Sequence, residues 1–204
     1  MGYQLTYWAK RGRAEQIRLL LNELGEEYED AHVSGDSFRA LQAEGPTCLT
    51  FGQVPMLTDG ELKLCQGPVI MSYLARKHGL APADLGQSCK ADALTAGAED
   101  MRIAYFKLFG EGGAERQAAF VDDRWKNRWL AGVNGVLEAN GTGFLVGDSL
   151  THADIAMWDI LDSITTWVAG ADFTGFEQVQ TFFDAIKARP NIAAYLGSDR
   201  RPKG

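Results

Sequence analysis

The 204-residue sequence contains only three cysteines and three histidines, and neither set is spaced like a metal or redox site. Cys48, Cys65 and Cys89 include no C-x-x-C pair, which argues against a disulfide framework, a zinc site and a vicinal-thiol redox centre. The histidines are scattered, so we expect no bound metal. We expect the cysteines to be ordinary thiols in a reducing compartment, which favours a cytoplasmic location.

Long apolar runs and an excess of basic residues are also missing. No stretch approaches the roughly 18 uncharged apolar residues of a membrane span. The first six residues lack the basic segment and apolar run of a signal peptide, so none is expected. Twenty Lys and Arg against 27 Asp and Glu give a net charge of −7. This balance disfavours non-specific binding of nucleic acid or of an anionic membrane, although it permits a local basic pocket.

Disorder is excluded as the dominant state, because 46% of the residues are hydrophobic. The first part of the chain alternates between strand and helix patterns. Residues 3–9 have the two-residue period of a strand, 14–24 have apolar residues at helical spacing, and 28–33 predict a second strand. Together they predict a β-α-β unit.

A second block follows from Phe51. Asp59-Gly60 carries the signal of a tight hairpin between two strands, and Gln66-Gly67-Pro68 predicts the start of a helix that ends near Gly79. This block therefore reads β-β-α. The Pro-, Ala- and Gly-containing stretch that follows is a candidate linker.

The rest of the chain is predicted to be helical almost throughout. Helices are expected over 91–109, 120–138 and 179–188, with a short one ending near Leu196. Thr151 and Asp154 form a capping box, which predicts the start of a strongly apolar core helix.

Four motifs, in this order, then connect the sequence to a known family. They are Tyr7 with Arg11-Gly12-Arg13-Ala14-Glu15, Gln53-Val54-Pro55, Gln66, and Leu145-Val146-Gly147-Asp148 with Thr151 and Asp154. Their order and spacing resemble the cytosolic glutathione transferases of the tyrosine type, especially the pi and sigma classes, over essentially the whole chain. The resemblance implies an α+β thioredoxin-like domain (βαβ-ββα) over 1–80, a linker over 81–85 and an all-helical domain over 86–204.

The resemblance also implies the chemistry of Tyr7. Glutathione reacts as a thiolate, and its unperturbed thiol pKa is about 8.5, so the enzyme must lower that pKa. A phenol at the end of a strand can donate a charge-assisted hydrogen bond to the sulfur anion. By resemblance Tyr7 has this role and Arg13 assists it. Glutathione is thus the implied co-substrate.

Further residues are implied to hold the tripeptide. Val54, before a cis Pro55, would offer its backbone N–H and C=O, as if glutathione added a strand. Gln53 lies beside them, and Gln66-Gly67 would present helix-start amides to the γ-glutamyl carboxylate. Asp100 matches an acidic residue that reaches the ammonium group of glutathione in the partner subunit.

Several positions depart from the family pattern. Gly67 stands where a serine is usual, which removes a hydroxyl donor. Phe38 stands where a tryptophan is usual and cannot donate an N–H. The lysine that clamps the glycyl carboxylate has no clear counterpart near Glu44-Gly45-Pro46. We expect weaker glutathione binding, by at most about 1–2 kcal/mol for the lost hydroxyl.

The resemblance implies an apolar electrophile pocket lined by Trp8, Ala9, Tyr105 and Phe109. Phe51 matches an aromatic key that inserts between two helices of the other subunit in a homodimer, although burial in the core is an equal alternative. The expected activity is conjugation of the glutathione thiolate to hydrophobic electrophiles. The alternatives are a glutathione-dependent isomerase of the sigma or prostaglandin-synthase type, and a non-catalytic ligand-binding or structural member of the fold.

Overall fold

A computed structural model of the chain describes residues 2–46 and 48–204. Met1, at the start of the predicted first domain, and Thr47 lie outside the described residues. The described part divides into two compact units, residues 2–78 with 189–204 and residues 79–188. Among the described residues no helix is both long enough and apolar enough to cross a membrane.

The first unit contains a mixed four-stranded sheet with the strand order β2-β1-β3-β4. Its strands are β1 (Tyr3–Tyr7), β2 (Tyr28–His32), β3 (Met56–Asp59) and β4 (Leu62–Cys65). β2 runs parallel to β1, whereas β3 is antiparallel to both β1 and β4. The predicted hairpin at Asp59-Gly60 joins β3 to β4, and Gly60 has the positive φ of 61° that favours glycine there. β1 is thus an interior strand of the sheet.

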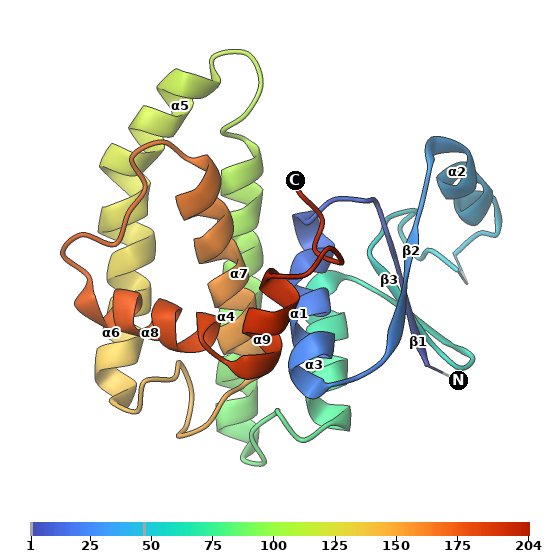
Figure 1. Cartoon of the computed structure of the whole chain (residues 1–204), viewed down its shortest axis with the longest axis horizontal. Coiled ribbons are helices and arrows are strands. Elements are labelled where there is room, and N and C mark those ends of the chain that lie inside the picture. The colour runs from blue at the N-terminus through green and yellow to red at the C-terminus, as the bar shows by residue number, and fades with distance from the viewer. Residues whose placement is uncertain (1, 47) are drawn as a thin grey trace. The chain divides into compact units, whose positions relative to one another are not determined.

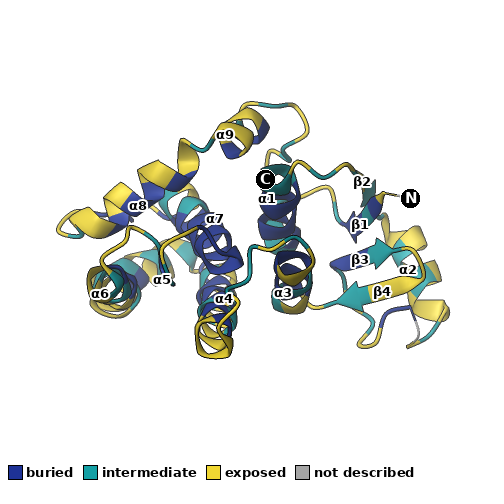
Figure 2. Cartoon of the chain, turned by 90° about the horizontal axis from the view of Figure 1, so that it is seen from below, coloured by how far each residue is buried: buried dark blue, intermediate teal, exposed yellow. Residues whose placement is uncertain are grey.

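Helices cover both faces of this sheet (Figures 1 and 2). α1 (Glu15–Leu24) and α3 (Gly67–Lys77) pack together on one face, and α2 (Gly35–Ala43) lies on the other. A short 3-10 turn, η1 (Gly12–Ala14), precedes α1. The β-α-β and β-β-α blocks of the sequence are therefore confirmed, and the fold is thioredoxin-like. α2 was not predicted, although Ser34 and Ser37 form a capping box at its start.

The last short helix, α9 (Pro190–Leu196), packs on α1 within the first unit. The buried carboxylate of Glu15 accepts hydrogen bonds from Tyr195 Oη at 3.1 Å and from Arg201 Nε at 2.8 Å. Burial and the charge of Glu15 raise the pKa of the Tyr195 phenol, which stays a neutral donor. Residues 189–204 thus pack with a unit to which the sequence does not assign them. The domain limits 1–80 and 86–204 remain predictions.

The second unit is all-helical, as the sequence predicted. Its helices are α4 (Leu85–Phe106), α5 (Gly113–Ala119), η2 (Phe120–Leu130), α6 (Ala131–Asn140), α7 (His152–Trp167) and α8 (Glu177–Lys187). α7 is the core helix and packs against α4 and α8. α4 starts six residues before the predicted start, because the side chain of Asp84 caps it by accepting from Gln87 N at 2.8 Å.

The segment predicted as one helix over 120–138 contains two backbone geometries. η2 is a π-helix, which continues into the α-helix α6. Trp125 and Leu130, five residues apart, are both buried, whereas Trp129 is only half-buried. A π-helix bonds residues five apart, which puts Trp125 and Leu130 on the same buried face.

The predicted capping box of α7 is present. The carboxylate of Asp154 accepts from Thr151 N at 2.7 Å, from Thr151 Oγ1 at 2.9 Å and from Leu145 N at 2.8 Å. Asp154 is fully buried, and this burial raises its pKa to about 6. One carboxylate therefore fixes both the start of α7 and the preceding loop.

Candidate active site

Three segments of the first unit meet at one end of the sheet. In the register of the ladder Thr6 faces Met56 and Met56 faces Cys65. One step further along, Tyr7 at the end of β1, Pro55 before β3 and Gln66 after β4 follow each other across the sheet. The three motifs that the sequence analysis singled out in this half of the chain are therefore brought together by strand pairing alone.

Tyr7 is held at this end by a backbone contact. Its side chain is only 8% exposed, and its hydroxyl oxygen accepts a hydrogen bond from Arg13 N at 3.1 Å. A phenol has one hydrogen to donate besides its acceptor lone pairs. Because the oxygen is the acceptor in this contact, the hydroxyl hydrogen remains available for donation to a ligand.

Gly12 makes this contact possible. It has a φ of +45°, and a Cβ added there would lie 2.6 Å from Tyr7 Oη and 3.0 Å from the ring. A side chain at position 12 would thus displace the phenol. This role of Gly12 was not predicted from the sequence. A glycine between two arginines, directly after a strand, was the signal that could have indicated it.

Arg18 holds the turn between Tyr7 and Arg13 by hydrogen bonds to its backbone carbonyl groups. This fully buried guanidinium donates from Nη1 to the carbonyl of Lys10 at 2.9 Å and from Nε to Asp30 at 2.8 Å. Arg11 N in the same turn donates to Gly204 O at 2.9 Å. Arg18 was missed from the sequence, because its helical position gave no sign that it binds loop carbonyls.

The peptide bond between Val54 and Pro55 is cis, as the resemblance implied. Pro55 is buried, Val54 is half-buried against Cys48, Leu49 and Met56, and Gln53 is exposed. Val54 and Pro55 therefore directly precede the start of β3, at the end of the sheet that carries Tyr7.

Gln66 and Gly67 form the start of α3. Gln66 is exposed and adopts φ 75° and ψ 110°, a left-handed conformation that is uncommon for residues other than glycine and often marks functional sites. Gly67 and Val69 begin the helix around Pro68, and the first amides of a helix have no partner within it. Such a helix start suits a carboxylate.

Phe38 lies on α2 and packs inward. Its ring centroid is 5.2 Å from that of Trp8, and it also contacts the cluster of Cys48, Leu49 and Met56. The structure therefore brings together Phe38 and Trp8, which the sequence analysis placed in different parts of the site. Ala9 follows in the exposed turn after β1.

The remaining predicted site residues belong to the second unit. Tyr105 and Phe109 form an edge-to-face pair with centroids 5.0 Å apart. Asp100 is exposed on α4 and lines a pocket of about 530 Å³, whose other charged residues are Asp123, Lys107, Arg116, Arg124 and Arg128. The local charge around Asp100 is thus positive, in a protein that is acidic as a whole.

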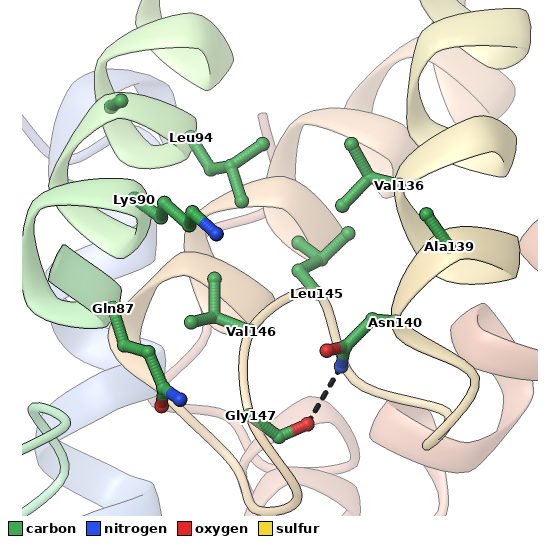
Figure 3. A pocket seen from close by; sticks show the side chains of 10 residues that line it. Gln87, Lys90, Leu94, Val136, Ala139, Asn140, Leu145, Val146 and Gly147 are labelled. Carbon is green, nitrogen blue, oxygen red and sulfur yellow. Dashed lines mark hydrogen bonds between the residues drawn. The ribbon is translucent and has the colours of Figure 1, made fainter. Parts of the chain in front are cut away.

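Another pocket of the second unit, of about 430 Å³, lies between α4, α6 and the loop that follows α6 (Figure 3). Leu94, Val136 and Leu145 give it apolar walls. Asn140 Nδ2 donates to Gly147 O at 2.6 Å and fixes the rim of the pocket.

Phe51 lies in the first unit. Its ring, which the sequence left between core burial and insertion into a partner, is 71% exposed. It is not a core residue of its own chain.

The comparisons with known proteins agree with this geometry. Residues 3–76 match the model of the glutathione S-transferase N-terminal domain, and residues 99–199 match that of the C-terminal domain. Glutathione S-transferase A of Cavia porcellus is 33% identical over 205 residues, which cover 97% of this chain and 92% of that protein. The chain belongs to the glutathione S-transferase family. It is accordingly an enzyme of the transferase type with glutathione as its co-substrate.

Other relatives come from more than one class of the family. Glutathione S-transferase P 1 of Xenopus laevis is 32% identical over 212 residues, covering 99% of this chain and 95% of that protein. The Pi-class glutathione S-transferase of Onchocerca volvulus has a TM-score of 0.87 at 26% identity, with 96% and 92% of the two chains covered. Prostaglandin synthase D of Nilaparvata lugens has a TM-score of 0.83 at 25% identity, with 98% of each chain covered.

Proposed function

We propose that Tyr7 activates the substrate thiol by donating its hydroxyl hydrogen to the sulfur anion of glutathione, as in the tyrosine-type classes. The observation that carries this proposal is the bond from Arg13 N to the phenol oxygen, which fixes the oxygen and leaves the hydrogen for the ligand. Lowering the thiol pKa by about 2 units requires roughly 2.7 kcal/mol in favour of the anion. One hydrogen bond to a charged group contributes about 1.5–3 kcal/mol, and the cationic side chain of Arg13 would add to it.

The tripeptide is proposed to lie along the end of the sheet. The backbone of Val54, beside Gln53 and the cis Pro55, pairs with it like an added strand. The amides at Gln66 and Gly67 receive the γ-glutamyl carboxylate. Support comes from the strand register, which places these segments next to Tyr7.

Two roles rest on the family resemblance more than on local geometry. Phe38 is proposed to face the glycyl end of glutathione, where its ring, packed on Trp8, supplies an apolar surface but no donor. Asp100 is proposed to reach the glutathione ammonium group in the partner subunit. Its exposed position on α4 is compatible with that role.

The second substrate is proposed to be a hydrophobic electrophile. As the family resemblance implies, Trp8, Ala9, Tyr105 and Phe109 would line its pocket. All but Ala9 are aromatic, and apolar walls of this kind favour apolar ligands. The product is the thioether conjugate, which suits a detoxification role in the cytoplasm.

A homodimer is proposed, with Phe51 as the contact residue. A phenyl ring that is 71% exposed suits burial in a partner. The apolar pocket between α4 and α6 of a second copy offers walls for it in Leu94, Val136 and Leu145. Sedimentation should show a dimer for the native protein and a monomer for both Phe51→Ser and Leu94→Glu. A dimer that withstands both substitutions would contradict this contact.

The test of the proposed role of Tyr7 is the pH profile of conjugation with an aryl halide for the native protein and Tyr7→Phe. At neutral pH the substitution should lower kcat/KM by about 30–100-fold, because only a few per cent of an unperturbed thiol is ionised there. The loss should shrink as the pH rises through about 8.5 and thiolate forms without help.

The matched control is Tyr73→Phe. This phenol lies in the same unit but donates to Asp59 at 2.6 Å, away from the described site residues. It should retain native kinetics. Equal rates for Tyr7→Phe and the native protein at neutral pH would contradict the role given to Tyr7.

A second candidate function is glutathione-dependent isomerisation. Its support is the likeness over 98% of the chain to a structure titled a prostaglandin synthase. Tyr7 would again hold the thiolate, but glutathione would be regenerated rather than consumed. Measuring glutathione consumption with an endoperoxide substrate separates the two activities. A non-catalytic ligand carrier would show neither activity, while still binding apolar ligands.

A further inference from the structure

The side-chain amide of Gln16 occupies the space beside Gly67, where a side chain at the start of α3 would otherwise lie. A Cβ added at Gly67 would be only 2.9 Å from Gln16 Nε2 and 3.6 Å from the carbonyl oxygen of Arg13. Gly67 is buried and its φ is not in the left-handed range, so the backbone would accept another residue. The glycine is therefore explained by the lack of room for a side chain beside Gln16, and not by its backbone conformation.

Gln16 is buried as well, with 1% of its surface exposed, and it is bound to the other half of the site. Its Nε2 donates to the carbonyl of Arg13 at 3.3 Å. The N–H of that same Arg13 donates to Tyr7 Oη. A continuous series of contacts thus runs from the phenol through the backbone of Arg13 and the amide of Gln16 to the first residue of α3.

We propose that Gln16 is a positioning residue for glutathione, which sets the distance between the thiol end of the site at Tyr7 and the carboxylate end at Gln66-Gly67. Gln16 and Gly67 form a matched pair, in which the amide fills the volume that the glycine leaves. The inference rests on the proposed function and assigns to this chain a determinant of glutathione affinity. The site lacks a hydroxyl group at position 67, and the side chain of Gln16 fills the space that a serine side chain would take there.

The proposal is tested by a double-substitution cycle on Gln16→Ala and Gly67→Ala, with KM for glutathione and kcat measured for each variant. Gly67→Ala alone should raise KM about 10-fold with kcat within 2-fold of native, because the new methyl group pushes the amide and shifts the helix start. Gln16→Ala alone should raise KM about 5-fold. In the Gln16→Ala background, adding Gly67→Ala should raise KM no further, since the methyl group enters the vacated space.

Two controls separate positioning from general loss of structure. Gly132→Ala adds a methyl group at a helical position where no atom beyond the helix's own nearby backbone lies within 4 Å, and should leave KM and kcat unchanged. Gln16→Glu keeps the size of the side chain but removes the N–H that donates to Arg13 O, and should also raise KM with little change in kcat. Thermal unfolding of every variant identifies any that fails to fold, and Gln16→Glu, as the isosteric change, then carries the test.

A rise in KM for Gly67→Ala that is the same factor in both backgrounds would overturn the pairing of Gln16 and Gly67. Native KM in Gln16→Glu would overturn the positioning role. Either result would leave the proposed function standing if the native protein still conjugates glutathione. Failure of the native protein to conjugate or bind glutathione would refute the proposed function and this inference together.

Discussion

The two compact units fix their irregular segments with single buried charges of opposite sign. In the first unit the guanidinium of Arg18 donates to the carbonyl of Lys10 in the turn after β1 and to Asp30. In the second unit the carboxylate of Asp154 accepts from the N–H groups of Leu145 and Thr151. A loop that turns its carbonyls inward needs buried donors, which a guanidinium supplies, and one that turns its amides inward needs buried acceptors, which a carboxyl group supplies.

The consequence for function differs between the units. The turn held by Arg18 runs directly from Tyr7 to Arg13 and positions the phenol that we propose to activate glutathione, whereas the loop held by Asp154 starts the core helix α7. Loss of Arg18 should therefore damage both stability and catalysis. Loss of Asp154 should affect stability first.

The largest expected effect is that of Arg18→Met. The substitution keeps an apolar side chain but removes the cation that pairs with the fully buried Glu15 and the half-buried Asp30, and with it the donor to the carbonyl of Lys10. Removing one partner of a buried ion pair typically costs about 3–5 kcal/mol. Urea unfolding should show this loss, and kcat/KM of the folded fraction should also fall. Native stability in Arg18→Met would show that the guanidinium of Arg18 is not needed to hold the turn after β1.

Gly12→Ala should have the next largest effect, and in the first unit it should fall mainly on catalysis. A Cβ at 2.6 Å from Tyr7 Oη, on a residue with φ +45°, displaces the phenol from its hydrogen bond. We expect kcat/KM to fall about 100-fold, equivalent to roughly 2.7 kcal/mol. Gly25→Ala is the matched control: this glycine also has a positive φ, 71°, but no atom within 4 Å. A similar loss of activity in both variants would show that backbone strain, rather than contact with Tyr7, is responsible.

The smallest effect at neutral pH is expected for Asp154→Ala, with a loss of about 2 kcal/mol of stability and an unchanged pH profile of conjugation. The pKa of Asp154 is raised to about 6 by burial, above its value of about 3.9 in an unfolded chain. A carboxyl group with a raised pKa binds its proton more tightly in the folded state. Its contribution to stability therefore falls as the pH rises from about 4 to 6.

Comparison of the two proteins isolates this group, since every other titrating residue is shared. The destabilisation caused by Asp154→Ala should be larger at pH 4 than at pH 7, by at most about 3 kcal/mol for a pKa difference of roughly 2 units. Unfolding by urea at a series of pH values measures it. A difference that grows with rising pH would show that the carboxylate form is the one the fold favours.

The sequence predicted those features that depend on local pattern. Strand alternation gave β1, the Asp-Gly dipeptide gave the hairpin, and Thr151 with Asp154 gave the start of α7. The resemblance of short motifs gave the family and the cis bond before Pro55. Each of these features has a signal that lies within a few neighbouring residues.

Features that depend on contacts between distant residues could not be predicted in this way. The side chain of Arg18 contacts carbonyls eight residues back, and Gln16 meets Gly67 across the unit. Glu15 binds Arg201, 186 residues further along the chain, which draws the C-terminal residues into the first unit. No local spacing reports such pairs, because strand pairing and helix packing bring them together only in the folded chain.

Titration of the bound glutathione thiol, followed by its ultraviolet absorbance, measures directly whether Tyr7 stabilises the thiolate. We expect the pKa of the bound thiol to lie about 2 units below the free value of roughly 8.5 in the native protein and in Tyr73→Phe, and to return close to the free value in Tyr7→Phe. An equally lowered thiol pKa in Tyr7→Phe would refute the role of Tyr7, because the anion would then be stabilised by groups other than the phenol.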